Sequence, residues 1–254
     1  MYFCFFTEIT MAENESWFAS WFDTTYYHIL YQNRDESEAQ LFIGNLIQQL
    51  QLSDESVLDL ACGKGRHAKY LSELGLNVMG VDLSHQSIDF ASQHSHSGLS
   101  FQVHDMRDVI PNVEFDVIFN LFTSFGYFDD DLDNHKVLQA VSNMLKPGGR
   151  LVIDFMNAVK AINNLVLTEK KDIEGIQFDL TRAYDGKFIH KYISFEDAGV
   201  NHAYKERVRA FRLEDFQHML NQNGFNVMQT FGDFNLNPFD ENMSDRLIIV
   251  AQKQ

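Results

Sequence analysis

Residues 57–68 read Val-Leu-Asp-Leu-Ala-Cys-Gly-Lys-Gly-Arg-His-Ala, which is a short apolar run, a glycine-rich turn and the start of a helical pattern. A glycine turn between a strand and a helix is the context that a nucleotide-binding site requires. Gly63 and Gly65 allow a sharp turn and a close approach of the ligand to the backbone. The helix that follows offers N–H groups at its first turn. The segment therefore predicts a nucleotide site at the first strand of an α/β sheet.

Short apolar strands alternate with helices on both sides of this turn. We expect strands at residues 57–60, 77–82, 99–103, 115–119 and 150–155. We expect helices at residues 66–74, 84–93 and 130–145, with Ser84 as the cap of the second. This alternation predicts an α/β fold with a parallel, doubly wound sheet. A helical pattern also runs from Trp17 to Leu50, so residues 1–50 are expected to form an N-terminal extension and cap helices.

The alternation stops after Asn157. Ile176–Tyr184 and Lys187–Phe195 are β-rich and are joined by Asp185-Gly186, a strong hairpin signal. Residues 161–210 are therefore expected to form a small antiparallel β insertion. It would separate two parts of one core, residues 51–160 and 211–254. The second part is expected to contain a helix at 213–223 and strands at 225–231 and 246–252.

Composition excludes several classes of function. The chain has 254 residues, 45% of them apolar, and a formal net charge of −16. Its length allows a substantial core, but its acidity is unsuited to neutralising the phosphates of nucleic acid. We therefore expect no nucleic-acid partner, and a cationic ligand fits the charge better.

The two cysteines, Cys4 and Cys62, form neither a disulfide framework nor a zinc pattern, which is typical of a reducing compartment. No run reaches the ~18 apolar residues of a membrane span. The apolar start of the chain ends at Glu8 without a basic leader. We expect a cytoplasmic protein with no membrane partner. Met11 reads as a second start, so residues 1–10 are either an upstream extension of the reading frame or an N-terminal arm.

Three aspartates lie at or just beyond the ends of successive predicted strands. Asp59 stands four residues before Gly63, Asp82 ends the second strand, and Asp105 follows the third. The carboxyl ends of parallel strands share one edge of the sheet, so these acids should line one site. With Ala68, the glycine spacing also fits the dinucleotide fingerprint of NAD enzymes. Asp59 argues against NAD because a carboxylate there would repel a pyrophosphate and suits an ammonium-bearing ligand. Asp82 is placed to accept from ribose hydroxyls and Asp105 from an adenine amino group.

These motifs resemble those of the class I S-adenosylmethionine-dependent methyltransferases, in the right order and spacing over residues 55–155. The matching segments are residues 59–65, 80–84, 103–106, 115–120, 145–151 and, near the end of the chain, 246–251. The last of these is similar to the reversed final strand of the family. The resemblance implies a seven-stranded Rossmann-like sheet of order 3-2-1-4-5-7-6 whose last strand is antiparallel.

The same resemblance implies S-adenosylmethionine as cofactor and S-adenosylhomocysteine as product. It implies that Ala61 lines the methionine pocket, and that Asn120, Leu121 and Phe122 lie near the sulfonium. The residues that it implies around the cofactor are Asp59, Ala61, Gly63, Gly65, Asp82, Leu83, Asp105, Met106, Asn120, Leu121, Phe122, Tyr27 and Arg34.

Tyr27 and Arg34 enter this set through a narrower likeness. In relatives similar to glycine N-methyltransferase, an N-terminal tyrosine and arginine close over the carboxylate of the cofactor. Tyr27, or a neighbouring tyrosine, and Arg34 are the matching residues. The fork of Arg34 suits a carboxylate, but a surface ion pair with Asp35 or Glu38 explains Arg34 equally well.

The sequence lacks the motifs of several other classes of methyltransferase. Asn120-Leu121-Phe122-Thr123 differs from the Asn/Asp-Pro-Pro-aromatic motif of enzymes that methylate amino groups of nucleic acids. The chain has no Pro-Cys pair for attack on a pyrimidine, and Cys62 reads as a small buried residue. Asp154-Phe155-Met156-Asn157 differs from the acidic pair of magnesium-dependent catechol methyltransferases. No histidine pair has a metal spacing, so we expect no metal.

The expected reaction is in-line transfer of a methyl group to an oxygen or nitrogen, less readily a carbon, of a small-molecule acceptor. The insertion follows the fifth strand, where methyltransferases commonly build a substrate lid. The sequence does not identify a catalytic base. The candidates are Tyr127, Asn157, His190 and Tyr192, with His202 and Arg207 also on the insertion.

These candidates have simpler interpretations. His190 and Tyr192 share one face of their strand, and that face is turned either to the substrate or to solvent and helices. Tyr127 belongs either to an aromatic wall or to the core. Three other functions remain open: a protein methyltransferase, whose acidic surface would attract basic tails, a non-catalytic S-adenosylmethionine-binding protein, and an NAD-dependent oxidoreductase.

Overall fold

The computed structural model describes residues 17–32, 36–122 and 124–254. The proposed N-terminal extension at residues 1–10, the second start at Met11 and the candidate Arg34 lie outside these ranges. Within the described residues, no helix combines the length and the apolar character that crossing a membrane demands.

Seven strands form the main sheet. They are β1 (Ser56–Leu60), β2 (Asn77–Asp82), β3 (Leu99–Val103), β4 (Phe115–Asn120), β5 (Leu145–Met156), β10 (Phe225–Phe231) and β11 (Arg246–Lys253). Their order is β10-β11-β5-β4-β1-β2-β3, and β11 is antiparallel to both of its neighbours. The order and the reversed last strand that the resemblance implied are thus confirmed. The strand order reverses beside β1, where open α/β sheets form their ligand crevice.

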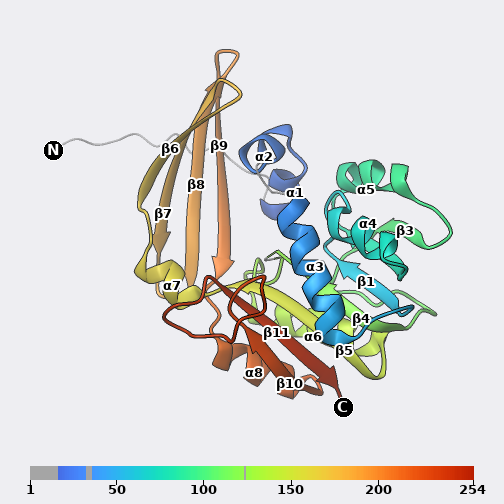
Figure 1. Cartoon of the computed structure of the whole chain (residues 1–254). Coiled ribbons are helices and arrows are strands. Elements are labelled where there is room, and N and C mark those ends of the chain that lie inside the picture. Colours follow the sequence, from blue (N-terminus) through green and yellow to red (C-terminus); the bar gives the residue numbers. More distant parts are fainter. Residues whose placement is uncertain (1–16, 33–35, 123) are drawn as a thin grey trace.

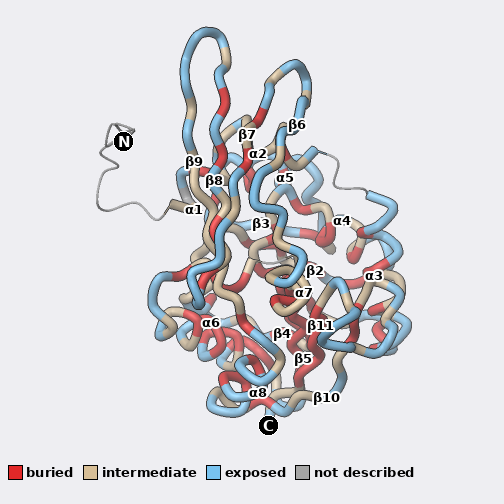
Figure 2. Tube along the Cα trace, turned by 90° about the vertical axis from the view of Figure 1, so that its left-hand side faces the viewer, coloured by how far each residue is buried: buried red, intermediate tan, exposed pale blue. Residues whose placement is uncertain are grey.

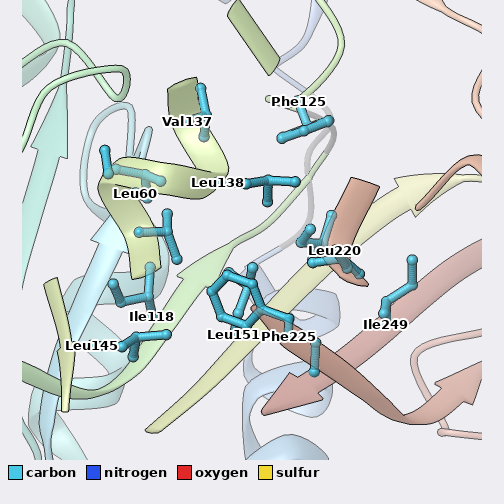
Figure 3. Packing of buried hydrophobic residues seen from close by; sticks show 14 of the residues in the cluster. Leu60, Ile118, Phe125, Val137, Leu138, Leu145, Leu151, Leu220, Phe225 and Ile249 are labelled. Atoms are coloured by element: carbon cyan, nitrogen blue, oxygen red, sulfur yellow. The ribbon is translucent and has the colours of Figure 1, made fainter. Parts of the chain in front are cut away.

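Helices cover both faces of this sheet. They are α3 (Glu36–Leu50), α4 (Arg66–Glu73), α5 (His85–Ala91), α6 (Asp131–Met144) and α8 (Leu213–Gln222). Apolar residues of α3 and α4 pack with one face, and those of α6 and α8 pack with the other. Figure 3 shows the core on this second face, and Val137 and Leu138 of α6, Leu220 of α8 and Ile118 of β4 belong to its single buried cluster. Ser84 caps α5 as predicted, because its hydroxyl accepts the N–H of Ser87 at 3.0 Å.

The insertion forms a separate four-stranded antiparallel sheet that extends away from the main sheet (Figure 1). Its strands are β6 (Thr168–Ile173), β7 (Ile176–Tyr184), β8 (Phe188–Asp197) and β9 (Val200–Arg209), and α7 (Ala158–Asn163) precedes them. The predicted hairpin at Asp185-Gly186 is present, and the Asp185 carboxylate accepts the N–H groups of Lys187 and Phe188. The sequence did not indicate β6 or α7. β6 is a charged edge strand with no apolar alternation, and most of its residues are exposed (Figure 2).

The N-terminal helical pattern is divided into three helices. α1 (Trp17–Phe22) and α2 (Thr25–Leu30), the cap helices, precede α3, and Thr24 caps α2 by accepting the N–H of Tyr27 at 3.1 Å. The cap helices pack on the inserted sheet, because Trp21 and Leu30 join one buried cluster with side chains of β7 and β8. Figure 1 shows α1 and α2 between β9 and the helices of the main sheet.

Candidate active site

The glycine turn joins β1 to α4 at the carboxyl edge of the sheet. Ala61, Gly63 and Gly65 all have positive φ, of 62°, 55° and 79°. The N–H of Cys62 donates to the carbonyl of Val81 on β2 at 2.9 Å. The turn is therefore fixed to the neighbouring strand, and its backbone is exposed to whatever lies above the sheet.

Asp59 is buried behind this turn and is not among the residues that line the cavity described below. Its side chain is 1% exposed, and its carboxylate accepts the N–H of Ala68 in the first turn of α4 at 3.0 Å. Burial raises the pKa of Asp59 to about 7, and the nearby charge of Asp82 adds to this, while the Ala68 bond opposes it. A carboxylate in this position anchors the start of α4.

Asp82 holds the other side of the turn. One carboxylate oxygen accepts the N–H of Gly63 at 2.8 Å and the other accepts the N–H of Ser84 at 2.9 Å. Burial raises the pKa of Asp82, although these backbone donors oppose the shift. Ser84 itself donates a hydrogen bond to Asp23 in the segment between the cap helices.

Asp105 is held by arginine. Arg107 donates to both of its carboxylate oxygens, with the shortest distance 2.6 Å, and also reaches Asp133 at 3.0 Å. Burial works against ionisation of Asp105, but the bonds from Arg107 outweigh it and keep the pKa of this carboxyl below its usual value. Asp105 is thus a fixed anion at the end of β3.

A cavity of about 440 Å³ lies above these strand ends. Nine of the implied cofactor residues line it. Those nine residues are Tyr27, Ala61, Gly63, Asp82, Leu83, Asp105, Met106, Leu121 and Phe122. Of the other described residues in that set, Asp59, Gly65 and Asn120 are buried behind the lining.

Aromatic side chains form the opposite side of the cavity, here called the ring wall. It consists of Phe18, Phe22, Tyr27, Tyr31, Tyr127 and Phe128. Tyr127 packs on Phe22 with ring centroids 5.3 Å apart and stacks on Phe18 at 6.5 Å. Tyr27 packs on Phe22 at 4.8 Å. One continuous aromatic surface therefore faces the strand ends across the cavity.

The comparisons with known proteins agree with this geometry. A sequence model of the methyltransferase domain matches residues 57–149. The putative methyltransferase YqeM of Bacillus subtilis is 28% identical over 207 residues, 78% of this chain and 83% of that protein. The glycine/sarcosine/dimethylglycine N-methyltransferase of Actinopolyspora halophila is 27% identical over 241 residues, 88% of this chain but 40% of that protein. A solved structure of an S-adenosylmethionine-dependent methyltransferase from Clostridium acetobutylicum matches with a TM-score of 0.75 at 22% identity, over 90% of this chain and 96% of the other.

Residues 57–149 form a methyltransferase domain, and the chain has the fold of solved S-adenosylmethionine-dependent methyltransferases. Its cofactor is S-adenosylmethionine, and two features of the site fit that molecule. A Cβ built on Gly63 would meet no atom within 4 Å, so the turn leaves open space at the cavity. The Oδ1 atom of Asn120 is buried and has no hydrogen-bond partner among the described residues, while its Nδ2 donates to the carbonyl of Leu60 at 2.9 Å. An unpaired acceptor beside the turn suits a ligand with N–H donors.

Three of the catalytic candidates, Asn157, His190 and Tyr192, are not among the residues that line the cavity. Asn157 caps α7 and donates to the carbonyls of Glu241 and Ser244 at 2.7 and 2.8 Å. His190 bonds Asp185 in the hairpin turn at 2.7 Å. Tyr192 is 45% exposed.

The candidates on the inserted sheet, which are His190, Tyr192, His202 and Arg207, each contact neighbouring side chains. The rings of His190 and Tyr192 stack at 6.2 Å, so they share a face as expected, on the side of the sheet opposite to Ile193 and the cap helices. His202 packs on Tyr26, and Arg207 pairs with Asp129. Tyr127 is the sequence candidate that lines the cavity.

Several lining residues of the methyltransferase were not named from the sequence. They are Phe18, Phe22, His28, Gln32, Lys64, Arg66, His67, Ser87, His104 and Ser124. The spacing of Phe18 and Phe22 places them on one face of α1, which is a readable signal. Nothing in the sequence states that this face is turned to a cavity. Among the described residues, no group of three or more potential metal ligands is present.

A buried polar cluster connects the ring wall of the methyltransferase to the inserted sheet. The Glu206 carboxylate on β9 accepts the Tyr31 hydroxyl at 2.6 Å and the indole N–H of Trp21 at 2.7 Å. Lys191 on β8 donates to the Tyr31 oxygen at 2.7 Å and lies 3.6 Å from Glu206. Burial and the adjacent Glu206 raise the pKa of the Tyr31 phenol well above its usual value. Tyr31 therefore stays protonated at neutral pH.

Removing the acid of this cluster should loosen the cap helices. Glu206→Ala leaves Trp21, Tyr31 and Lys191 without their shared partner, which costs about 2 kcal/mol for buried groups of this kind. We expect a lower free energy of unfolding and a shift in tryptophan emission, because Trp21 is one of two tryptophans in the chain. Urea unfolding followed by fluorescence measures both. Glu196→Ala removes an exposed acid of β8 and is the matched control; equal effects of the two variants would contradict the assignment.

Proposed function

We propose that this methyltransferase transfers the methyl group to a nitrogen or oxygen atom of a small organic molecule. The observation that carries the proposal is one cavity of about 440 Å³ that extends from the glycine turn to the ring wall. Small-ligand pockets measure ~300–1,000 Å³. The cap helices supply lining residues opposite the strand ends, which favours an enclosed small acceptor over a protein chain.

The proposed cofactor contacts follow from the lining. Asp82 and Leu83 would bind the ribose and one side of the adenine, and Asp105 and Met106 would bind the other side. Each carboxylate oxygen of Asp82 accepts one backbone N–H, and a carboxylate oxygen can accept a second bond. Gly63 would leave room for the methionine portion.

The cofactor supplies a methyl group on a positively charged sulfur. The part of the protein is then to orient the acceptor and exclude water, and orientation contributes at most ~7–11 kcal/mol to such reactions. Tyr127, in the ring wall, is the residue that we propose to touch the acceptor. Tyr31 is unsuited to act as a base because its phenol stays protonated.

The proposed division of the chain has three parts. Residues 51–160 and 211–254 form the cofactor-binding core, residues 1–50 supply the cap, and residues 161–210 act as a substrate lid. The packing of Trp21 and Leu30 on the inserted sheet supports this role, because the insertion then holds the cap helices over the cavity.

A relative supports nitrogen as an acceptor atom. The protein from Actinopolyspora halophila is named for methylation of glycine, sarcosine and dimethylglycine, which are small amines. The ring wall is compatible with an amine, since aromatic faces attract cations by about 0.5–2 kcal/mol.

Loss of the Asp82 carboxylate should weaken cofactor binding strongly. In Asp82→Ala the ribose hydroxyls lose a charged acceptor, and bonds of this type are worth ~1.5–3 kcal/mol. We expect the dissociation constants of S-adenosylmethionine and S-adenosylhomocysteine, measured by calorimetry, to rise about 100-fold.

Asp89→Ala is the matched control, since it removes an exposed acid of α5 with the same change in charge. NAD serves as the competing ligand. Preferential binding of NAD by wild-type protein would contradict the proposal, and so would Asp82→Ala protein that binds S-adenosylmethionine as tightly as the wild type. Product formation with added small amines or phenols then separates the enzyme from a non-catalytic binding protein.

A further inference from the structure

Phe122 has a backbone conformation that its side chain disfavours. It follows β4 with φ of +67° and lines the cavity. The left-handed region costs about 1–2 kcal/mol for a residue with a Cβ. Such strain persists only where the surroundings fix the conformation, and it concentrates at functional sites. The groups that hold Phe122 are therefore of interest.

A buried carboxylate holds the strained peptide. The N–H of Phe122 donates to Oδ2 of Asp154 at 3.0 Å. Asp154 lies in β5, next to β4 in the sheet, and its side chain is 1% exposed. Its Oδ1 accepts Nε of Arg246, the first residue of β11, at 2.8 Å. Three adjacent strands thus meet at one turn of the cavity wall.

The same arginine also contacts the Phe122 ring. The guanidinium carbon of Arg246 lies 6.0 Å from the ring centroid, and that of Arg66, at the start of α4, lies 5.4 Å from it. Both distances are within the range of cation–π attraction, ~6 Å. The backbone and the ring of Phe122 are therefore both fixed by charged groups.

If the Asp154–Arg246 ion pair served only to join β5 to β11, Asp154 would not also need to accept the N–H of Phe122. Burying a carboxylate costs several kcal/mol unless pairing and hydrogen bonds compensate it. Asp154 uses one oxygen for Arg246 and the other for the amide of a cavity residue. The second bond does nothing for the pairing of β5 with β11, and it acts on the wall of the active site.

We propose that Asp154 and Arg246 are positioning residues that hold the Phe122 turn in its left-handed conformation and thereby shape the part of the cavity that receives the sulfonium end of the cofactor. This inference rests on the proposed function of the cavity. Neither residue lines the cavity, so both act through Phe122.

The test compares ligands that do and do not reach this turn. Asp154→Asn retains a single acceptor oxygen, so either the Phe122 amide or Arg246 loses its partner. By calorimetry we expect the dissociation constants of S-adenosylmethionine and S-adenosylhomocysteine to rise about tenfold. The constant of adenosine, which lacks the methionine portion, should stay within about twofold, because the contacts at Asp82 and Asp105 are intact.

Asp116→Asn is a matched control. The Asp116 carboxylate at the opposite end of β4 accepts the N–H of Ser56 at 2.9 Å and pairs with Lys146 at 2.7 Å, which is the same chemistry away from the cavity. It should bind all three ligands as the wild type does. Arg246→Lys, which keeps the charge but loses the fork, should act in the same direction as Asp154→Asn and remains informative if that variant does not fold.

A double-variant cycle isolates the role of the turn. Glycine adopts a positive φ without support, so Asp154→Asn should have no further effect on ligand binding in a Phe122→Gly background. Equal weakening of adenosine and S-adenosylhomocysteine in Asp154→Asn, or no weakening of either, overturns the inference. Wild-type protein that fails to bind S-adenosylmethionine overturns the proposed function as well, whereas unchanged binding in the variant overturns only the role of Asp154.

Discussion

Replacing Gly63 with valine is expected to abolish measurable binding of S-adenosylmethionine while the protein remains folded. Gly63 has φ of +55° and lines the cavity. A Cβ at this position meets no protein atom within 4 Å. A side chain added at this position would therefore start in the open space where we propose that the cofactor binds. Calorimetry should show a loss of at least about 1,000-fold, or about 4 kcal/mol.

A second glycine separates this effect from backbone strain. Gly175, in the turn between β6 and β7, has φ of +80°, and a Cβ added there would likewise meet no atom within 4 Å. Gly175→Val should therefore carry a similar cost of about 1–2 kcal/mol and bind the cofactor normally. Gly65 is unsuitable for this comparison because its Cβ would lie 2.6 Å from the Phe101 ring. Normal affinity in Gly63→Val would show that the cofactor binds elsewhere.

Replacing Asp59 with asparagine is expected to change how stability depends on pH. Burial raises the pKa of Asp59 to about 7 in the folded protein, against about 3.9 in an unfolded chain. Between these values the folded state holds a proton that the unfolded state has released. The contribution of Asp59 to stability is therefore greatest below about pH 4 and is lost as the pH rises towards 7.

Asparagine remains neutral and keeps an oxygen that can accept the N–H of Ala68. The free energy of unfolding of Asp59→Asn, relative to wild type, should rise between pH 4 and pH 8 by up to about 4 kcal/mol. Urea unfolding at several pH values measures it. Asp116→Asn is the control, and the change of its unfolding free energy with pH should have the opposite sign. Burial raises the pKa of the Asp116 carboxyl, but the bond and charge of Lys146 lower it by more. Parallel pH profiles for wild type and Asp59→Asn would contradict the prediction.

Local signals in the sequence accounted for the core of the fold. The glycine turn, the acids at Asp82 and Asp105, the cap at Ser84 and the hairpin at Asp185-Gly186 are all properties of neighbouring residues. β6 was not predictable on this basis, because a charged edge strand is stabilised by pairing with β7 and not by an apolar pattern. The single helical pattern before Leu50 likewise did not reveal the breaks between α1, α2 and α3.

The site depends on contacts that local patterns do not contain. Asp59 was expected beside the ligand, and local patterns did not indicate that its buried carboxylate accepts the N–H of Ala68. The shared face of His190 and Tyr192 was predicted from alternation, yet alternation does not say which face meets the cap helices. Asp154 was noted only in a segment that lacks the acidic pair of catechol methyltransferases, and its partner Arg246 lies far along the chain. Pairing of β5 with β11 brings the two together.

Trp21 and Leu30 near the start of the chain share one buried cluster with Phe178 and Ile193 in the insertion. Two distant stretches of the gene, those for the cap helices and for the inserted sheet, therefore encode one packed unit beside the cavity. Recombination between related enzymes at a single crossover inside the main sheet would join the cap helices of one parent to the inserted sheet of the other. Such hybrids should inherit mismatched halves of this cluster. Exchange of acceptor preference between relatives thus calls for both stretches to be transplanted together.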